Sequence, residues 1–122
     1  MLTILYVEDN DHLRQTMGLL LEDDGREIVL CATAEEALAA CATRHFDLVI
    51  TDVSLPGMRG TELARRLLAT DASRWIAICS GYDFGGSVAR LGPNVRSLPK
   101  PFDAATLEAL IEEVRRADTE RT

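Results

Sequence analysis

Short runs of apolar residues alternate with longer stretches that carry apolar residues at helical spacing, and this alternation limits the folds open to the chain. The apolar runs cover residues 2–7, 28–31, 48–51 and 75–79, and residues 96–98 are expected to form a short last strand. Each run has the length of a buried strand. Strands that alternate with helices pair in parallel, and the helices cover both faces of the sheet. The sequence therefore predicts a three-layer, doubly wound α/β fold with a five-stranded parallel sheet.

The order of the strands and the ends of the helices can also be predicted. Right-handed crossovers leave few topologies, and we expect the flavodoxin-like (βα)5 order 2-1-3-4-5. Thr33 and Glu36 form a capping-box pattern, and Gly25 is expected to end the first helix in the left-handed conformation. Residues 82–94 are rich in glycine, so any helix there must be short. Asp103 is expected to cap the last helix.

Length and charge restrict the domain organisation and the partners. The 122 residues allow one domain, which we place at 1–117, followed by a polar tail at 118–122. Thirteen Lys and Arg against 20 Asp and Glu give a net charge of −7, which disfavours direct binding of nucleic acid or of an anionic membrane. No apolar run has the length of a membrane span, and the three cysteines lie among apolar neighbours without a CxxC pair. We expect a cytoplasmic protein with reduced thiols.

Four of the predicted strands end in polar groups suited to phosphate or metal chemistry. Glu8 and Asp9 follow the first strand, Asp52 the third, Ser80 the fourth and Lys100 the fifth. Ligands of open parallel sheets bind at the carboxyl ends of the strands, and these strands are neighbours in the expected topology. Three carboxylates held close together repel one another unless they share protons or bind a hard cation. Mg²⁺, or alternatively Mn²⁺, suits such oxygen ligands and would bridge them to a phosphate.

Each of these residues has a simpler explanation when it is taken alone. Asp9 or Asp52 would be a helix cap, Ser80 part of a Ser-Gly turn, and Lys100 a solvated charge. The coincidence of all of them at one edge of the sheet favours a shared site.

The motifs at these strand ends resemble the receiver domain of bacterial two-component response regulators. They are Leu5–Asp9, Val49–Gly60 with its D-x-x-L-P-G-M-x-G pattern, Ser80–Gly81 and Lys100–Phe102. The resemblance covers about residues 2–116. It implies that Asp52 is the phosphoacceptor, which takes a phosphoryl group from a phosphohistidine.

The resemblance also implies the roles of the neighbouring residues in the metal site. Asp9 and Asp52 would bind Mg²⁺ directly, and Glu8 would act through water. The backbone carbonyl of Ser54 would complete the protein ligands.

Two further residues would contact the phosphoryl group. Ser80 would donate its hydroxyl to one oxygen, and Lys100 would place its charge beside another. Such a domain is not an enzyme with external substrates, because it catalyses only its own phosphorylation and dephosphorylation. Its partners would be a sensor histidine kinase or a histidine phosphotransfer protein, and a downstream protein that the sequence does not identify. A homodimer, and membership of a larger regulator or hybrid kinase, stay open.

Ser97 departs from the family pattern, since many receivers carry Tyr or Phe three residues before the lysine as a rotating switch. A serine is too small to fill or vacate a pocket. We expect the segment from Ser80 to about Gly92 to change conformation instead, with Tyr82 or Phe84 in place of the missing aromatic ring.

Three other functions remain as alternatives. A degenerate receiver would bind proteins without being phosphorylated, and Ser97 keeps this alternative open. A Mg²⁺-dependent phosphohydrolase with an aspartyl nucleophile normally has a second acid two residues after the nucleophile, where this chain has Ser54. A nucleotide-binding domain would need a glycine-rich first turn, where this chain has Glu8-Asp9-Asn10-Asp11.

Overall fold

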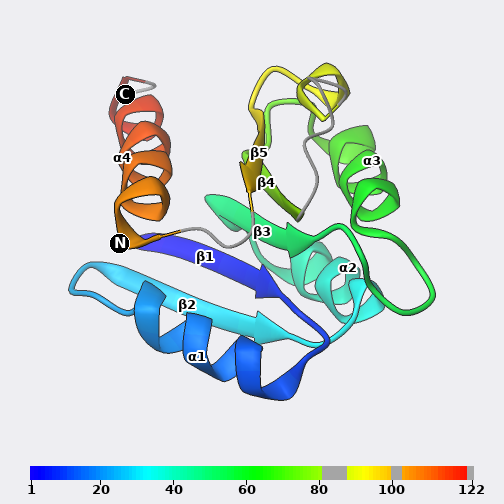
Figure 1. Cartoon of the computed structure of the whole chain (residues 1–122). Coiled ribbons are helices and arrows are strands. Elements are labelled where there is room, and N and C mark those ends of the chain that lie inside the picture. Colours follow the sequence, from blue (N-terminus) through cyan, green and yellow to red (C-terminus); the bar gives the residue numbers. More distant parts are fainter. Residues whose placement is uncertain (81–87, 100–102, 121–122) are drawn as a thin grey trace.

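Five parallel strands form one sheet in the order β2-β1-β3-β4-β5 (Figure 1) in the computed structural model, which describes residues 1–80, 88–99 and 103–120. The strands are β1 (Leu2–Val7), β2 (Arg26–Cys31), β3 (Leu48–Asp52), β4 (Ile76–Ser80) and β5 (Val95–Pro99). The helices of the described residues are α1 (Asp11–Leu21), α2 (Ala34–Thr43), α3 (Gly60–Thr70), the 3₁₀ helix η1 (Ala89–Leu91) and α4 (Ala104–Glu120). The predicted fold class, parallel pairing and strand order are confirmed.

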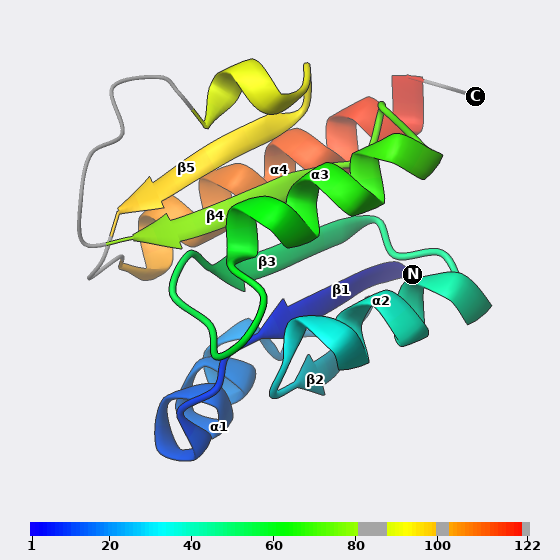
Figure 2. The ribbon, with the colours of Figure 1, turned by 90° about the vertical axis from the view of Figure 1, so that its right-hand side faces the viewer.

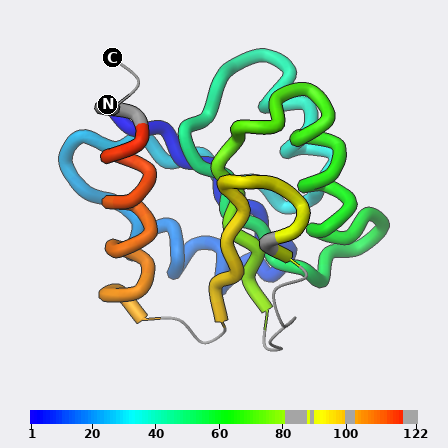
Figure 3. Tube along the Cα trace, turned by 90° about the horizontal axis from the view of Figure 1, so that it is seen from above, coloured from blue at the N-terminus to red at the C-terminus, as the bar shows by residue number. Residues whose placement is uncertain are grey.

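Helices cover both faces of the sheet, so the molecule has three layers (Figure 2, Figure 3). On one face, α2 and α3 pack against Leu5 and Val7 of β1. On the other face, α1 and α4 pack against Ile4 and Tyr6 of the same strand. Successive residues of a strand point to opposite faces. Because both faces are buried, the central strands are continuous apolar runs rather than alternating ones.

Polar side chains begin α2 and α4 as the sequence predicts. The Thr33 hydroxyl accepts a hydrogen bond from the N–H of Glu36 at 3.1 Å, and the Glu36 carboxylate accepts one from the N–H of Ala32 at 3.3 Å. The Asp103 carboxylate accepts a hydrogen bond from the N–H of Thr106 at 2.8 Å, which lowers the pKa of the Asp103 carboxyl. N–H groups of a first helical turn have no partner within the helix, so these bonds fix where both helices start.

The prediction that Gly25 ends α1 is wrong. The helix ends at Leu21, and Glu22 already has an extended backbone. Gly25 does adopt the left-handed conformation, with φ of 81°, but in the turn before β2, where its carbonyl accepts a hydrogen bond from the N–H of Leu2. Acidic residues are unfavourable at the negative end of a helix dipole, so the acids at 22–24 disfavour a longer helix.

The helix between β4 and β5 is short, as predicted, whereas the C-terminal helix is longer than predicted. Between residues 88 and 94, the helical element is the three-residue η1. Helix α4 continues to Glu120, beyond residue 117, where we expected a polar tail to begin. The division into a domain at 1–117 and a tail at 118–122 stays a prediction. No helix of the described residues is long and apolar enough to cross a membrane.

The three cysteines are free thiols, as the lack of a paired spacing predicts. Cys31 and Cys79 are buried, and Cys41 is partly buried. Burial raises the pKa of the Cys31 thiol to about 11. The Cys31 thiol is therefore protonated at neutral pH and packs as a small apolar group.

The connection from β3 to α3 returns so close to β3 that only glycine fits at its end. The N–H of Gly60 donates to the carbonyl of Val53 at 3.1 Å. A Cβ atom on Gly60 would lie 2.1 Å from the backbone carbonyl oxygen of Asp52. That distance is far shorter than a van der Waals contact, so Gly60 determines how α3 approaches the end of β3.

Arg26 joins the start of β2 to both helices of one face. Its side chain is 3% exposed and pairs with the Glu108 carboxylate of α4 at 2.5 Å and 3.1 Å. The same guanidinium donates to the Leu21 carbonyl at the end of α1, at 3.0 Å. Arg26 therefore holds α1 and α4 against the same edge of the sheet.

We expect Gly60→Ala to lower the free energy of unfolding by about 1–3 kcal/mol, because the added methyl group forces the backbone of Asp52 to move. Gly18→Ala in α1 is the matched control. Its Cβ would meet only the flexible end of the Leu30 side chain, at 3.1 Å, and alanine favours a helix over glycine by about 0.8–1.0 kcal/mol. Urea denaturation measures both variants. Equal losses of stability would contradict the close approach at Gly60.

Replacement of Arg26 by methionine tests the link between the two helices. We expect Arg26→Met to lower the free energy of unfolding by about 1.5–3 kcal/mol, because the Leu21 carbonyl and the Glu108 carboxylate both lose a charged donor. Arg44→Met breaks an exposed Arg–Glu pair, with Glu27 at 2.8 Å, and should cost at most about 1 kcal/mol. Thermal and urea unfolding measure the difference. A cost for Arg26→Met no greater than that for Arg44→Met would show that the link does not stabilise the fold.

Candidate functional site

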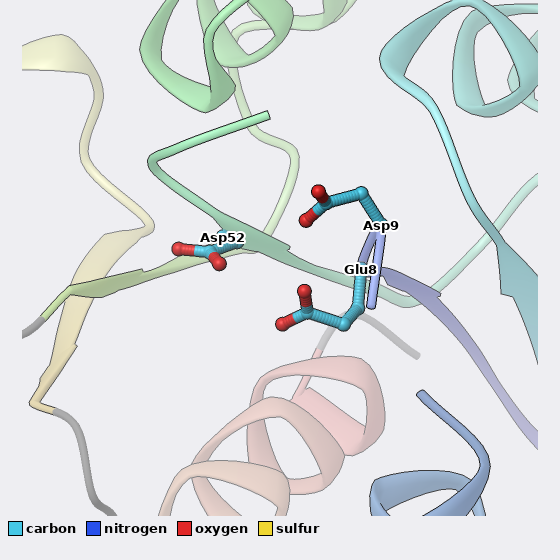
Figure 4. Close-up of side chains that lie close together, drawn as sticks. All are labelled: Glu8, Asp9 and Asp52. Carbon is cyan, nitrogen blue, oxygen red and sulfur yellow. The ribbon is translucent and has the colours of Figure 1, made fainter. Parts of the chain in front are cut away.

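Three carboxylates meet at the carboxyl edge of the sheet. Glu8 and Asp9 follow β1, and Asp52 is the last residue of β3. One carboxylate oxygen of each lies within 4.8 Å of the others, and Figure 4 shows the three groups gathered at the ends of the two strands. Val7 pairs with Thr51 across the two strands, so the residues that follow them leave the sheet at the same level. The predicted juxtaposition is confirmed, and metal binding by these residues stays a prediction.

The three side chains differ in their exposure to solvent. Glu8 is 2% exposed, Asp52 is partly buried and Asp9 is exposed. Tyr6 precedes Glu8 by two residues and lies buried on the same side of β1. Burial, together with the negative charges of Glu8 and Asp52, raises the pKa of the Tyr6 phenol well above its usual range. The Tyr6 phenol is therefore neutral at physiological pH.

The turn from β1 to α1 holds Glu8 by its backbone and by its side chain. The N–H of Asn10 donates to Oε2 of Glu8 at 3.1 Å, and the Asn10 side chain caps α1 by accepting from the N–H of Leu13 at 2.9 Å. Arg14 donates to the backbone carbonyl of Glu8 at 2.9 Å and pairs with Asp11 at 2.5 Å. The first turn of α1 thus orients the acid pair.

Asp52 is held from β3, from β4 and from the turn that follows it. The Thr51 hydroxyl donates to the backbone carbonyl of Asp52 at 3.0 Å. Beyond Asp52, the N–H of Val53 donates to the carbonyl of Cys79 in β4 at 2.9 Å. The N–H of Ser54 donates to Oδ1 of Asp52 at 3.3 Å. The predicted role of the Ser54 carbonyl as a metal ligand stays a prediction.

The predicted phosphoryl ligands lie on β4 and after β5. Ser80 is the last residue of β4 and is 2% exposed. Because Asp52 pairs with Cys79, Ser80 stands one residue beyond the level of Asp52. Lys100 lies outside the described residues, as do Tyr82 and Phe84 of the expected switch segment.

Sequence reasoning missed the residues that position the acids. Asn10 follows the acid pair at the start of a helix, so its capping role could have been found from its type and place. Gly60 ends the D-x-x-L-P-G-M-x-G motif, but its close approach to the backbone of Asp52 was not predicted. The bond from Arg14 to the Glu8 carbonyl depends on where a long side chain turns back, and no local pattern predicts it.

The donor set of this cluster fits a hard cation. Within the described residues, the carboxylates of Glu8, Asp9 and Asp52 are its members, and no thiol or imidazole joins them. Mg²⁺ prefers a small number of carboxylate ligands and keeps several waters. Asp9 is exposed, so water can reach the cluster on its side, whereas Glu8 is buried.

The sequence matches the response regulator receiver domain over residues 4–112. It is 32% identical to the transcriptional regulatory protein AfsQ1 of Streptomyces coelicolor over 98% of this chain and 54% of that protein. It is 47% identical to the sensor histidine kinase AruS of Pseudomonas aeruginosa, over 51% of this chain and 6% of that protein. The chain thus spans about half of AfsQ1 and a small part of AruS.

A similar solved structure is the response regulator protein TrrA from Thermotoga maritima in complex with Mg²⁺-BeF. It has a TM-score of 0.83 and 25% identity, and the match covers 93% of this chain and 99% of that one. The fold, the acidic strand ends and a family match over most of the chain agree. This chain belongs to the response regulator receiver domain family.

Proposed function

We propose that this chain is a phosphoacceptor in which Asp52 takes a phosphoryl group from a phosphohistidine with the help of Mg²⁺. The observation that carries the proposal is the convergence of Glu8, Asp9 and Asp52 within 4.8 Å in a member of the receiver family. A carboxylate oxygen of Asp52 forms a bond to phosphorus while the N–P bond of the phosphohistidine breaks. The imidazole leaves with the electron pair of that bond.

The metal site would combine carboxylate and backbone oxygens. Asp9 and Asp52 supply direct ligands, the backbone carbonyl of Ser54 supplies a third, and Glu8 acts through water. The hydrogen bond from the N–H of Asn10 to Glu8, at 3.1 Å, supports this role, because it holds the buried acid in one orientation. When bound by these residues, Mg²⁺ would neutralise charge on the acids and on the incoming phosphoryl group. Mn²⁺ is the alternative ion, since it has a similar preference for oxygen ligands.

Ser80 and Lys100 would complete the phosphoryl site. The Ser80 hydroxyl donates to one phosphoryl oxygen, and Lys100 places its charge beside another. The position of Ser80, buried at the end of the strand next to β3, supports its part. Positioning and neutralisation of charge carry most of the catalysis of phosphoryl transfer. The domain therefore catalyses only its own phosphorylation and dephosphorylation.

The phosphoryl donor would be a sensor histidine kinase or a histidine phosphotransfer protein in the cytoplasm. Phosphorylation is relayed as a conformational change to a downstream protein or to another segment of a longer chain. We assign the relay to residues 80–92, because Ser97 is an exposed serine on β5 and has no ring to move. Ser97 also favours a second candidate function, a receiver that binds proteins without phosphorylation.

Phosphorylation can be tested directly. We expect acetyl phosphate and Mg²⁺ to add one phosphoryl group to the wild type, as measured by intact mass spectrometry. Asp52→Asn should remain unlabelled, because an amide is a poor nucleophile. Asp24→Asn, which removes an exposed carboxylate from the α1–β2 turn, is the matched control and should label like the wild type. Labelling of Asp52→Asn would contradict the assignment. A wild type that no phosphorylated kinase or acetyl phosphate labels would support the second candidate.

The carboxylate cluster should link Mg²⁺ to stability. Two acids at this separation repel each other by on the order of 1 kcal/mol even at the dielectric constant of water. Millimolar Mg²⁺ should therefore raise the Tm of the wild type, because the ion binds the native state. Asp9→Asn should raise the Tm without Mg²⁺ and remove the response to the ion, whereas Asp24→Asn should keep it. A wild-type melting curve that ignores Mg²⁺ would contradict the metal site.

A further inference from the structure

Helix α1 lies beside β2, the strand at one edge of the sheet (Figure 1), and an exposed apolar groove lies between these two elements. Leu19 on α1 is 69% exposed and Leu30 on β2 is 39% exposed. Gly18 has no side chain, so the Leu30 side chain lies over the helix backbone there. The groove has a volume of about 340 Å³. We call this surface the α1–β2 face; its lining residues are Gln15, Gly18, Leu19, Glu22, Ile28 and Leu30.

Acidic residues adjoin the α1–β2 face. Glu22, Asp23 and Asp24 follow α1 directly and are exposed. Together with Arg26 and Glu27 they line a second hollow, which shares Glu22 and Ile28 with the apolar groove. The two hollows therefore form one continuous surface, with leucines in one part and carboxylates in the other.

Glu22, Asp23 and Asp24 lie at the C-terminal end of α1, where negative charge is unfavourable. The C-terminal end of a helix carries partial negative charge and is stabilised by cations. The last turn of α1 has no basic residue, and three carboxylates follow it. Arg26 is the cation at this end of α1: its guanidinium pairs with Glu108 and donates to the Leu21 carbonyl. The hydrogen bond to Glu108, helped by the negative charge of Asp23, raises the pKa of this guanidinium. In the described part of the chain, Glu22, Asp23 and Asp24 form no ion pair with a Lys or Arg side chain.

This surface is separate from the carboxylate cluster of Glu8, Asp9 and Asp52. Helix α1 starts beside that cluster and runs back along the sheet. Its last residue, Leu21, precedes the turn that bonds to the start of β1 through the N–H of Leu2 and the carbonyl of Gly25. The acids at 22–24 therefore lie at the amino edge of the sheet, and no role in phosphoryl transfer explains them or the exposed leucines.

We propose that the α1–β2 face binds a segment of another protein that presents apolar side chains next to Lys or Arg. Apolar side chains of the partner would cover Leu19 and Leu30, and its cations would neutralise Glu22, Asp23 and Asp24 at the negative end of α1. A second copy of this chain does not fit, because a symmetric contact through this face would offer the acids only Arg26, which is already paired with Glu108. The same charges oppose nucleic acid and anionic membranes.

Peptide binding to the full chain tests this surface. The probe is a labelled 14-residue synthetic helix with leucine on one face and lysine on the other, and fluorescence anisotropy gives the Kd. We expect Leu19→Gln to raise the Kd at least tenfold. Leu20→Gln, one residue along the same helix and outside the lining of the groove, is the matched control and should change the Kd less than twofold. Melting curves confirm that both variants are folded.

A charge-matched pair of triple variants separates this surface from net charge. Amide replacement of Glu22, Asp23 and Asp24 should raise the Kd at least tenfold and flatten its dependence on salt. Amide replacement of the exposed acids Glu35, Glu112 and Glu113 removes the same charge elsewhere and should have little effect. Equal effects of the two triples would overturn the proposal. Self-association that Leu19→Gln abolishes, or binding to vesicles of anionic lipid in preference to the peptide, would also overturn it.

Discussion

The register between β1 and β3 is the constraint on which the rest of the structure depends. Val7 pairs with Thr51, so Glu8 and Asp52 leave neighbouring strands at the same level. A slip of one residue would turn every side chain of a strand to the opposite face. The two apolar cores prevent such a slip, because each strand contributes side chains to both of them. Burial of these faces supplies the free energy that holds like charges together at one edge.

Most of the fold and the acids of the site could be predicted because they depend on local patterns. The strands are apolar runs of strand length, and the acids come directly after them. Glycine often ends a helix in the left-handed conformation, which predicts the end of α1 at Gly25. The helix instead ends at Leu21. The tether from Arg14 to the Glu8 carbonyl and the close approach of Gly60 to Asp52 depend on three-dimensional paths of the chain. Periodicity carries no information about them.

Ser97 cannot act as a switch that moves between a buried and an exposed position. It lies exposed on β5, where it pairs in register with Ile78 of β4. A side chain that is already exposed and small has no buried position to leave, so its rotation would change little in the core. Ser80 differs from it, because it is buried at the end of β4, close to the level of Asp52. A change at Asp52 therefore has a more direct route through β4 than through the side chain at position 97.

The two ends of α1 show opposite relations between charge and helix stability. At its start, Asn10 caps the helix and Asp11 lies at the positive end of the dipole, so local stability and the orientation of Glu8 require the same residues. At its end, the acids at 22–24 lie at the negative end, next to the exposed Leu19. Sequences that break a local rule tend to do so at functional surfaces. The start of α1 is explained within the molecule, whereas at its end Arg26 bonds to the Leu21 carbonyl and the proposed partner would supply further cations to the acids at 22–24.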